Sequence, residues 1–149
     1  MKKKERQQFL FAIVTVLFLL FIWGQSVLPV KDSAAESTWL RETLINPILR
    51  YLGLTEVNDH VVRKAAHVAE FLLLSVFATL HLRGKAARAL MVCFTVAFLD
   101  ETIQLISDRG AQVQDVWIDL IGIATGSFLG WLITQKRKDY GEKSAKRQE

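Results

Sequence analysis

Apolar residues gather into four long blocks along the chain, and most of the charged residues lie between these blocks. A membrane-crossing helix needs about 20 mostly apolar residues, and residues 9–28, 61–82, 87–106 and 116–133 form such blocks. Residues 9–30 carry no charge, whereas a soluble amphipathic helix has a polar face along its length. The pattern therefore predicts an all-α integral membrane bundle of four transmembrane helices.

The segments outside these blocks are polar. We expect residues 1–8 to form a cytoplasmic N-terminus, residues 9–133 the membrane domain with an outer loop at 29–60, and residues 134–149 a charged cytoplasmic tail. Within the outer loop, residues 38–52 place apolar side chains at near-helical spacing, and Pro47 predicts a kink or a restart. This segment is either an interfacial helix on the outer membrane surface or a lid packed on the bundle.

Charge sets the expected direction of the helices. With four spans, the two ends of the chain and the loop at 83–88 share one side, which holds 13 of the 19 Lys and Arg residues but only 4 of the 15 Asp and Glu residues. Cytoplasmic segments of membrane proteins are enriched in Lys and Arg. Both termini are therefore expected in the cytoplasm, and the same topology explains the pI of about 9.4 without a nucleic-acid partner.

Ionisable residues nevertheless occur inside the second, third and fourth blocks. Each costs about 2.5–3.5 kcal/mol on insertion scales, so that it needs a partner or water. Alternation of direction places the start of the second block, the end of the third and the start of the fourth on the outer side. The residues concerned are Arg63, Lys64, His67, Glu70, Asp100, Glu101, Gln104, Asp108, Arg109, Asp115 and Asp119.

Two of these carboxylates are expected deep in the membrane. At a helical rise of 1.5 Å per residue, Glu70 lies about 13 Å beyond Val61, and Asp100 lies about 9 Å before Ile106. Short carboxylate side chains do not reach the surface from such depths. The sequence therefore predicts one shared polar pocket that opens outward.

Three glycines follow in the fourth block at a strict four-residue spacing: Gly122, Gly126 and Gly130. A ridge of small residues allows another helix to approach closely. We interpret this ridge as a helix-packing surface that brings the charged faces together.

The ordered polar residues resemble the VanZ-like family of bacterial membrane proteins. The matching elements are Arg63-Lys64-x-x-His67-x-x-Glu70, Asp100-Glu101-x-x-Gln104, and Asp108-Arg109-Gly110 followed by Asp115-x-x-x-Asp119-x-x-Gly122-x-x-x-Gly126. The resemblance covers residues 62–132, and the ordered set is more specific than any single piece. It implies a bacterial membrane protein grouped with glycopeptide (teicoplanin) resistance, and it implies no established reaction.

The leading functional hypothesis is binding or modification of an anionic envelope component, such as a membrane lipid or a lipid-linked precursor, at the outer face. Arginine suits bidentate contacts with phosphate and carboxylate groups. The ligand-binding residues expected for this role are Arg63, Lys64, Gln104, Arg109, Asp115 and Asp119.

Three alternatives stay open. A membrane enzyme would use His67 as a general base with Glu70, Asp100 or Glu101 as its acid or orienting partner. The charges would be purely structural if Arg63 paired with Glu70 or Asp119, and if Arg109 paired with Asp100, Glu101 or Asp108. Homo-oligomers would be needed for an ion-coupled transporter. One histidine among carboxylates is a poor zinc signature, so we expect no metal and no cofactor.

Overall fold

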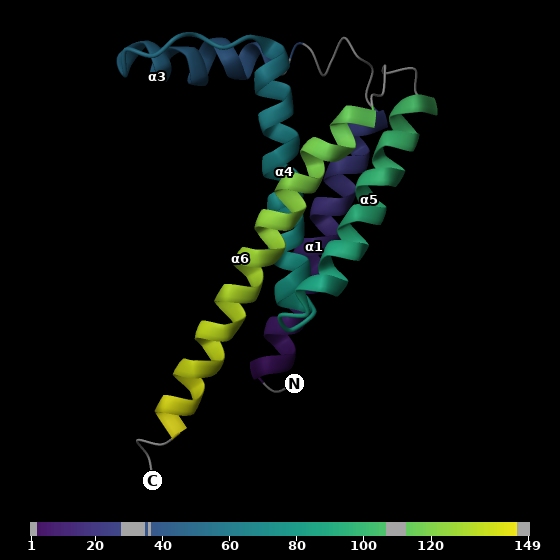
Figure 1. Ribbon diagram of the computed structural model, residues 1–149, viewed down its shortest axis with the longest axis vertical. Helices are drawn as coiled ribbons and strands as arrows, with labels where there is room; N and C mark the ends of the chain where they lie inside the picture. The colour runs from purple at the N-terminus through teal and green to yellow at the C-terminus, as the bar shows by residue number, and fades with distance from the viewer. Residues whose placement is uncertain (1–2, 28–34, 36, 107–112, 146–149) are drawn as a thin grey trace.

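Four long helices lie alongside one another in the computed structural model, which describes residues 3–27, 35, 37–106 and 113–145 (Figure 1). They are α1 (Lys3–Val27), α4 (Asp59–His81), α5 (Ala86–Ile106) and α6 (Val113–Ala145). Helix α1 begins and helix α6 ends at the same end of the bundle, called here the proximal end (Figure 1). The opposite, distal end is where α4 and α6 begin and α5 ends. The described residues are thus all-helical, as predicted.

Helix α4 is the centre of the bundle. It contacts α1, α5 and α6, and its contact with α6 is the most extensive. The first turn of α4 is capped by Asn58, whose Oδ1 accepts a hydrogen bond from the Val61 amide at 3.0 Å, which satisfies an otherwise orphaned helix donor. All four helices contribute to the buried apolar core, which comprises Ile22, Phe71, Leu74, Ala78, Ala89, Cys93, Val96, Ala97 and Ile123.

Large apolar side chains also cover the outside of the bundle, as expected for lipid contact. Phe9, Leu17, Phe98 and Phe128 are each more than half exposed. Within the described residues, three stretches are long and apolar enough to cross a membrane: Glu5–Val27, Ala86–Ile106 and Asp115–Gly141. Helix α4 is not among these three stretches, because the charged residues of its first half lower its mean hydropathy.

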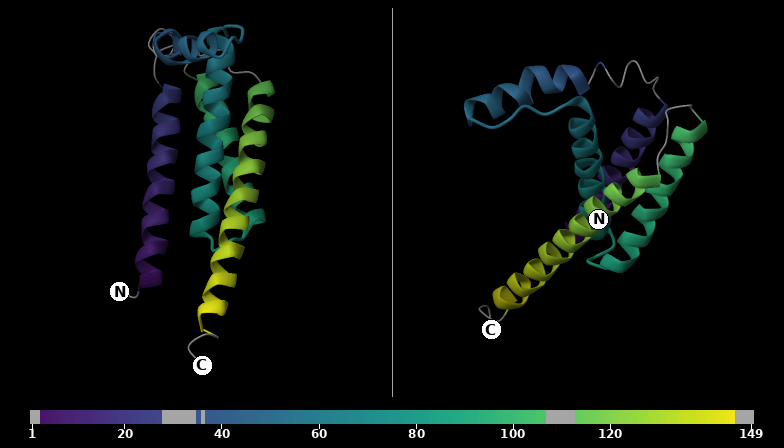
Figure 2. Two further views of the ribbon diagram at one scale, coloured as in Figure 1. Left: turned by 90° about the vertical axis from the view of Figure 1, so that its left-hand side faces the viewer. Right: turned by 45° about the horizontal axis from the view of Figure 1, so that its top comes forward.

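The predicted helix at residues 38–52 is present, but its hydrogen bonding changes partway. A π-helix, η1 (Arg41–Ile45), leads into α3 (Asn46–Tyr51), with Pro47 in the first turn of α3. Proline has no amide hydrogen to bond the carbonyl four residues earlier, and the Asn46 amide donates to the Arg41 carbonyl, five residues back. Together with residues 37–40 before them and residues 52–57 after them, these elements form an arm that extends sideways from the distal end of α4 (Figures 1 and 2). The interfacial helix and the lid both stay predictions for this segment.

The arm is stabilised by a buried asparagine. Asn46 is 2% exposed, and its Oδ1 accepts a hydrogen bond from the Val57 amide at 3.1 Å. Beside it, Arg50 Nε and Glu56 Oε1 form an ion pair at 2.5 Å. The hydrogen bond from Arg50, together with its charge, lowers the pKa of the Glu56 carboxyl below its ordinary value. The arm therefore has a defined shape of its own.

Helix α6 continues beyond the expected fourth span. We expected a membrane segment at residues 116–133 followed by a charged tail that is either a fraying helix or disordered, and in the structure the helix runs without a break to Ala145. The residues after Gln135 are mainly Lys, Glu and Arg, which have high helix propensity. The proximal part of α6 consequently projects past the other helices (Figure 2).

Candidate functional site

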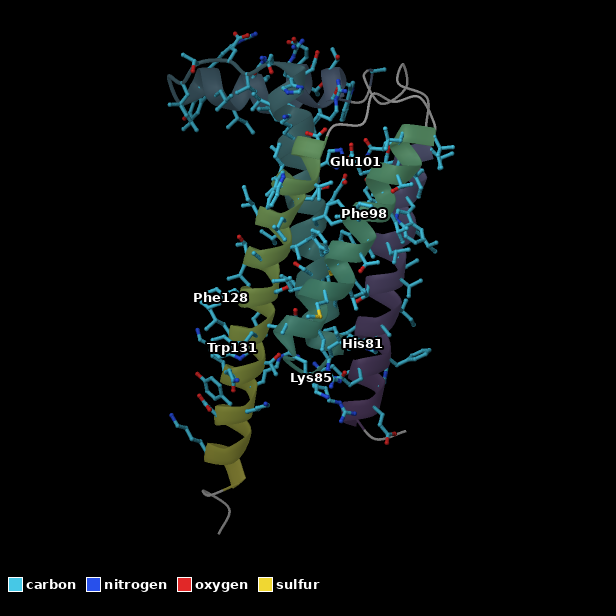
Figure 3. All side chains as sticks on the ribbon, turned by 45° about the vertical axis from the view of Figure 1, so that its right-hand side comes forward. His81, Lys85, Phe98, Glu101, Phe128 and Trp131 are labelled. Carbon is cyan, nitrogen blue, oxygen red and sulfur yellow. The ribbon has the colours of Figure 1, made fainter. Side chains whose placement is uncertain are left out.

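Polar side chains from all four long helices meet in the distal half of the bundle. Asp100, Glu101 and Asp119 are each at most 7% exposed, although charged side chains are almost never fully buried without partners. Figure 3 labels Glu101 and Phe98 in the distal half of α5. These charged residues therefore lie inside the bundle, close to the polar side chains of the other helices. The groups that contact them define the site.

Asp100 links α5 to α1. Its Oδ1 accepts a hydrogen bond from Ser26 Oγ at 2.5 Å, and its Oδ2 accepts one from Gln104 Nε2 at 2.8 Å. Gln104 Nε2 also lies 3.5 Å from Ser26 Oγ. Hydrogen bonds to both oxygens offset the cost of burying this carboxylate.

Two contacts join α4 to α6. Lys64 Nζ lies 3.4 Å from Asp115 Oδ1, and His67 Nδ1 lies 3.9 Å from Asp119 Oδ1. Lys64 and His67 are three residues apart on α4, and Asp115 and Asp119 are four residues apart on α6. Residues at either spacing share one helix face, so the two pairs can form along one contact. The two helices run in the same direction, so that this register repeats along the contact.

The carboxylates form one electrostatic cluster. Asp119 lies within electrostatic range of the carboxylates of Asp100, Glu101, Asp115 and Glu70. Like charges so close together in a low-dielectric region require cations or shared protons. Among the described residues, Lys64 supplies a cation at the α6 side of the cluster, and His67 supplies a second one when its ring is protonated.

A pocket of about 200 Å³ lies between α1, α4, α5 and the start of the arm. Its apolar wall includes Phe21, Ile22 and Val62. Phe21 is 50% exposed, so the pocket reaches the apolar outer surface of the bundle. The polar lining consists of Gln25, Ser26, Ser37, Arg63, His67, Glu70 and Gln104.

Arg63 is the cation of this pocket. The structure contains no ion pair between Arg63 and Glu70 or Asp119, the two partners expected if the charges were purely structural. The Nε atom of Arg63 is buried and has no hydrogen-bond partner among the residues that the structure describes. A buried guanidinium donor without a partner is costly, which makes this position suited to a bound anion.

The structure thus brings together most of the predicted site residues. Arg109, together with Asp108 and Gly110, lies outside the described residues. In the part of the chain that the structure describes, no three His, Cys, Asp or Glu side chains are arranged to hold a metal ion.

The glycine ridge of α6 packs directly on the backbone of α4. A Cβ atom at Gly122 would lie 2.4 Å from the Val68 carbonyl oxygen, and one at Gly126 would lie 2.2 Å from that of Leu72. At Gly130 the nearest atom would be Thr79 Cβ, at 2.7 Å. No side chain larger than hydrogen fits at such distances, so the ridge is a packing surface, and it brings Asp119 to His67.

Three polar residues of the site were not predicted from the sequence: Gln25, Ser26 and Ser37. A signal was present, because Gln25 and Ser26 are adjacent polar residues near the end of an uncharged block. The expected topology puts that end at the same level as Asp100. This signal is weak, because neutral polar side chains are common near the ends of membrane helices.

Comparison with known proteins identifies the family of this chain. The sequence profile of the VanZ/LLP1 family matches residues 9–134. YwnJ, an uncharacterized membrane protein of Bacillus subtilis (strain 168), is 32% identical over 91 residues, which are 61% of this chain and 62% of that protein. The matched region therefore spans less than two thirds of the length of this relative. No solved structure matches the chain significantly. With a match that extends from the first apolar block to the end of the fourth, this chain is a membrane protein that belongs to the VanZ/LLP1 family.

Proposed function

We propose that all four long helices cross the bacterial plasma membrane, with both termini in the cytoplasm and the arm on the outer surface. Helix α4 has 23 residues, which is long enough to span, and the charged side chains of its first half, Arg63, Lys64 and Glu70, are partly buried. The unequal distribution of Lys and Arg supports the orientation. The distal site then lies in the outer half of the membrane.

Cysteine labelling in intact cells tests this topology. We expect Leu54→Cys, at an exposed position of the arm, to react with a membrane-impermeant thiol reagent, and Tyr140→Cys, at an exposed position of the α6 tail, to react only after the cells are opened. The native Cys93 is buried and provides little background. Labelling of Tyr140→Cys in intact cells would reverse the orientation.

The function we propose is binding of an anionic envelope component, a lipid or a lipid-linked precursor, in the distal pocket. The observation that carries this proposal is the buried guanidinium Nε of Arg63 at the pocket wall, which has no hydrogen-bond partner in the described part of the chain. Ser26, Ser37 and Gln104 add neutral hydrogen-bonding groups in the same lining. A polar headgroup would be held by these side chains.

The apolar wall of the pocket supports a lipid in particular. Phe21 and Leu40 lie at the pocket edge, and Phe21 is exposed on the surface that would face lipid. An acyl or isoprenoid chain would leave the pocket along this surface without crossing a polar barrier. A small soluble anion would gain nothing from such a wall.

Removal of the Arg63 guanidinium tests the proposal. Native mass spectrometry counts the anionic lipids bound to each molecule of the purified protein, and we expect Arg63→Ala to lower the occupancy of one such site at least about tenfold, since charge-assisted hydrogen bonds contribute about 1.5–3 kcal/mol. Arg63→Lys should recover only part of the binding, because lysine lacks the planar fork of donors. Teicoplanin susceptibility of cells carrying the same variants is the second readout.

Arg88→Ala is the matched control, because Arg88 is an exposed arginine at the start of α5, outside the pocket. It should leave lipid retention and susceptibility close to those of the wild type. If Arg63→Ala changed neither quantity, or if Arg88→Ala changed both equally, the pocket would not be an anion site and the resistance link would lose its support.

An enzymatic role is the second candidate, and the contact between His67 and Asp119 favours it. A carboxylate that faces one imidazole nitrogen orients the ring and stabilises its protonated form, as in other general bases. His67 also lines the distal pocket, so that a bound headgroup would lie within its reach. Conversion of a retained lipid-linked substrate during incubation would distinguish this role from binding alone.

A further inference from the structure

A second pocket lies at the proximal end of the bundle, between the beginning of α1, the end of α4 and the projecting part of α6. Its volume is about 600 Å³, within the usual range for small-molecule sites. Three cationic side chains line it, Arg83, Arg137 and Lys138, together with the carboxylate of Glu5. The lining therefore carries an excess of positive charge.

The turn that presents Arg83 is unusual. Helix α4 ends with the Gly84 amide bonded to the Thr79 carbonyl at 2.9 Å and the Arg83 amide bonded to the Leu80 carbonyl at 3.2 Å, which is a Schellman motif. Arg83 occupies the left-handed position of this motif, with φ of 56°, where glycine is preferred. Strained residues of this kind occur preferentially at functional sites.

Packing fixes this turn against α6. A Cβ atom at Gly84 would lie 2.8 Å from Thr134 Cγ2, so that the turn and α6 are in direct contact beside the pocket. The hydrogen bond from Gln8 Nε2 to the Leu80 carbonyl, at 3.4 Å, joins α1 to the same region. The turn that carries Arg83 is thus in contact with two other helices.

The opposite wall of the pocket is partly aromatic. The Arg137 guanidinium lies 5.4 Å from the centre of the Phe11 ring, a distance typical of cation–π contacts. Phe11 lies in the first turn of the apolar stretch of α1, which begins at Phe9. Cations above an apolar surface at a membrane edge match the layering of a phospholipid, with its phosphate above its acyl chains.

We propose that this proximal pocket binds the phosphate of an anionic phospholipid, with Arg83, Arg137 and Lys138 as the contacting residues. Under the orientation proposed above, the lipid belongs to the cytoplasmic leaflet, although the binding itself does not depend on that orientation. The site is separate from the distal pocket, at the other end of the bundle. It would anchor the projecting part of α6 to α1 and to the membrane surface.

Lipid retention by the purified full-length protein tests this site, with phosphatidylglycerol and phosphatidylcholine as probes in native mass spectrometry. We expect the wild type to prefer phosphatidylglycerol, and Arg83→Asn, Arg137→Gln and Lys138→Gln each to lower its retention about fivefold, the factor that corresponds to one cation near a membrane surface. Asparagine tolerates the left-handed backbone of residue 83. Lys138→Gln keeps the test valid if loss of the contact with Phe11 unfolds Arg137→Gln.

Lys85→Gln is the control. Lys85 lies in the same turn and is exposed (Figure 3), but it does not line the pocket, so retention should fall less than twofold. An equal loss in Lys85→Gln would reduce the effect to general surface charge and overturn the site. Equal retention of the two lipids by the wild type, or full displacement of phosphatidylglycerol by inorganic phosphate, would also overturn it. Lys138→Gln should lower phosphatidylglycerol retention by the same factor in the Arg63→Ala background, which separates failure here from failure of the distal site.

Discussion

Gly126→Val should destabilise the bundle by about 3 kcal/mol or more, because overpacking a tightly filled contact costs about 1–3 kcal/mol and sometimes more. A Cβ atom at residue 126 would lie 2.1 Å from Ser75 Oγ and 2.2 Å from the Leu72 carbonyl oxygen. The hydroxyl can rotate away, but the carbonyl belongs to the backbone of α4. The two helices must therefore separate, and the core around Leu74 and Ile123 loses its packing. Unfolding of the purified protein by a denaturing detergent measures the change.

Gly141→Val is the matched control on the same helix. Nothing lies within 4 Å of a Cβ atom at residue 141, so the same substitution should change stability by less than about 1 kcal/mol, the range of helix propensity. Equal destabilisation by the two variants would show that the ridge does not pack on α4. Separation of the helices would also be expected to disturb the contact between His67 and Asp119, so that stability and site geometry should fail together.

The glycine ridge and the four blocks were accessible from the sequence, because both depend on local spacing. A four-residue period of glycines identifies one helix face, and long apolar runs identify membrane segments. The charged residues of α4, α5 and α6 were also predicted to meet, since alternating directions bring their polar ends to one level. The four crossings and the roles of these residues remain predictions.

Contacts between distant segments were not accessible. Ser26 and Asp100 are 74 residues apart, and nothing in either local pattern specifies which faces of α1 and α5 meet. The same limit applies to Arg63, because one of its two expected carboxylate partners, Asp119, lies against His67 instead, at 3.9 Å. The left-handed turn at Arg83 was missed for another reason: glycine is the usual residue of that position, and here it follows one residue later.

The hydrogen bond between Ser26 and Asp100 should make a measurable contribution to the stability of the bundle. Ser26→Ala leaves a buried carboxylate oxygen without one donor, which costs about 1–3 kcal/mol. In a double-mutant cycle with Asp100→Asn, we expect a coupling energy of about 1–2 kcal/mol, because hydrogen bonds inside membrane proteins contribute modestly. The free energies of unfolding of the two single variants and of the double variant, each compared with that of the wild type, give the coupling energy.

Thr125 provides the comparison for this cycle. Its hydroxyl donates to the Ile121 carbonyl of its own helix at 2.8 Å and lies on an exposed face, so Thr125→Val and Asp100→Asn should be additive within about 0.5 kcal/mol. Additivity of Ser26→Ala and Asp100→Asn as well would mean that α1 does not contribute to the polar cluster. The distal pocket would then lose the helix that supplies Phe21, Gln25 and Ser26, and with it the wall on which a lipid headgroup depends.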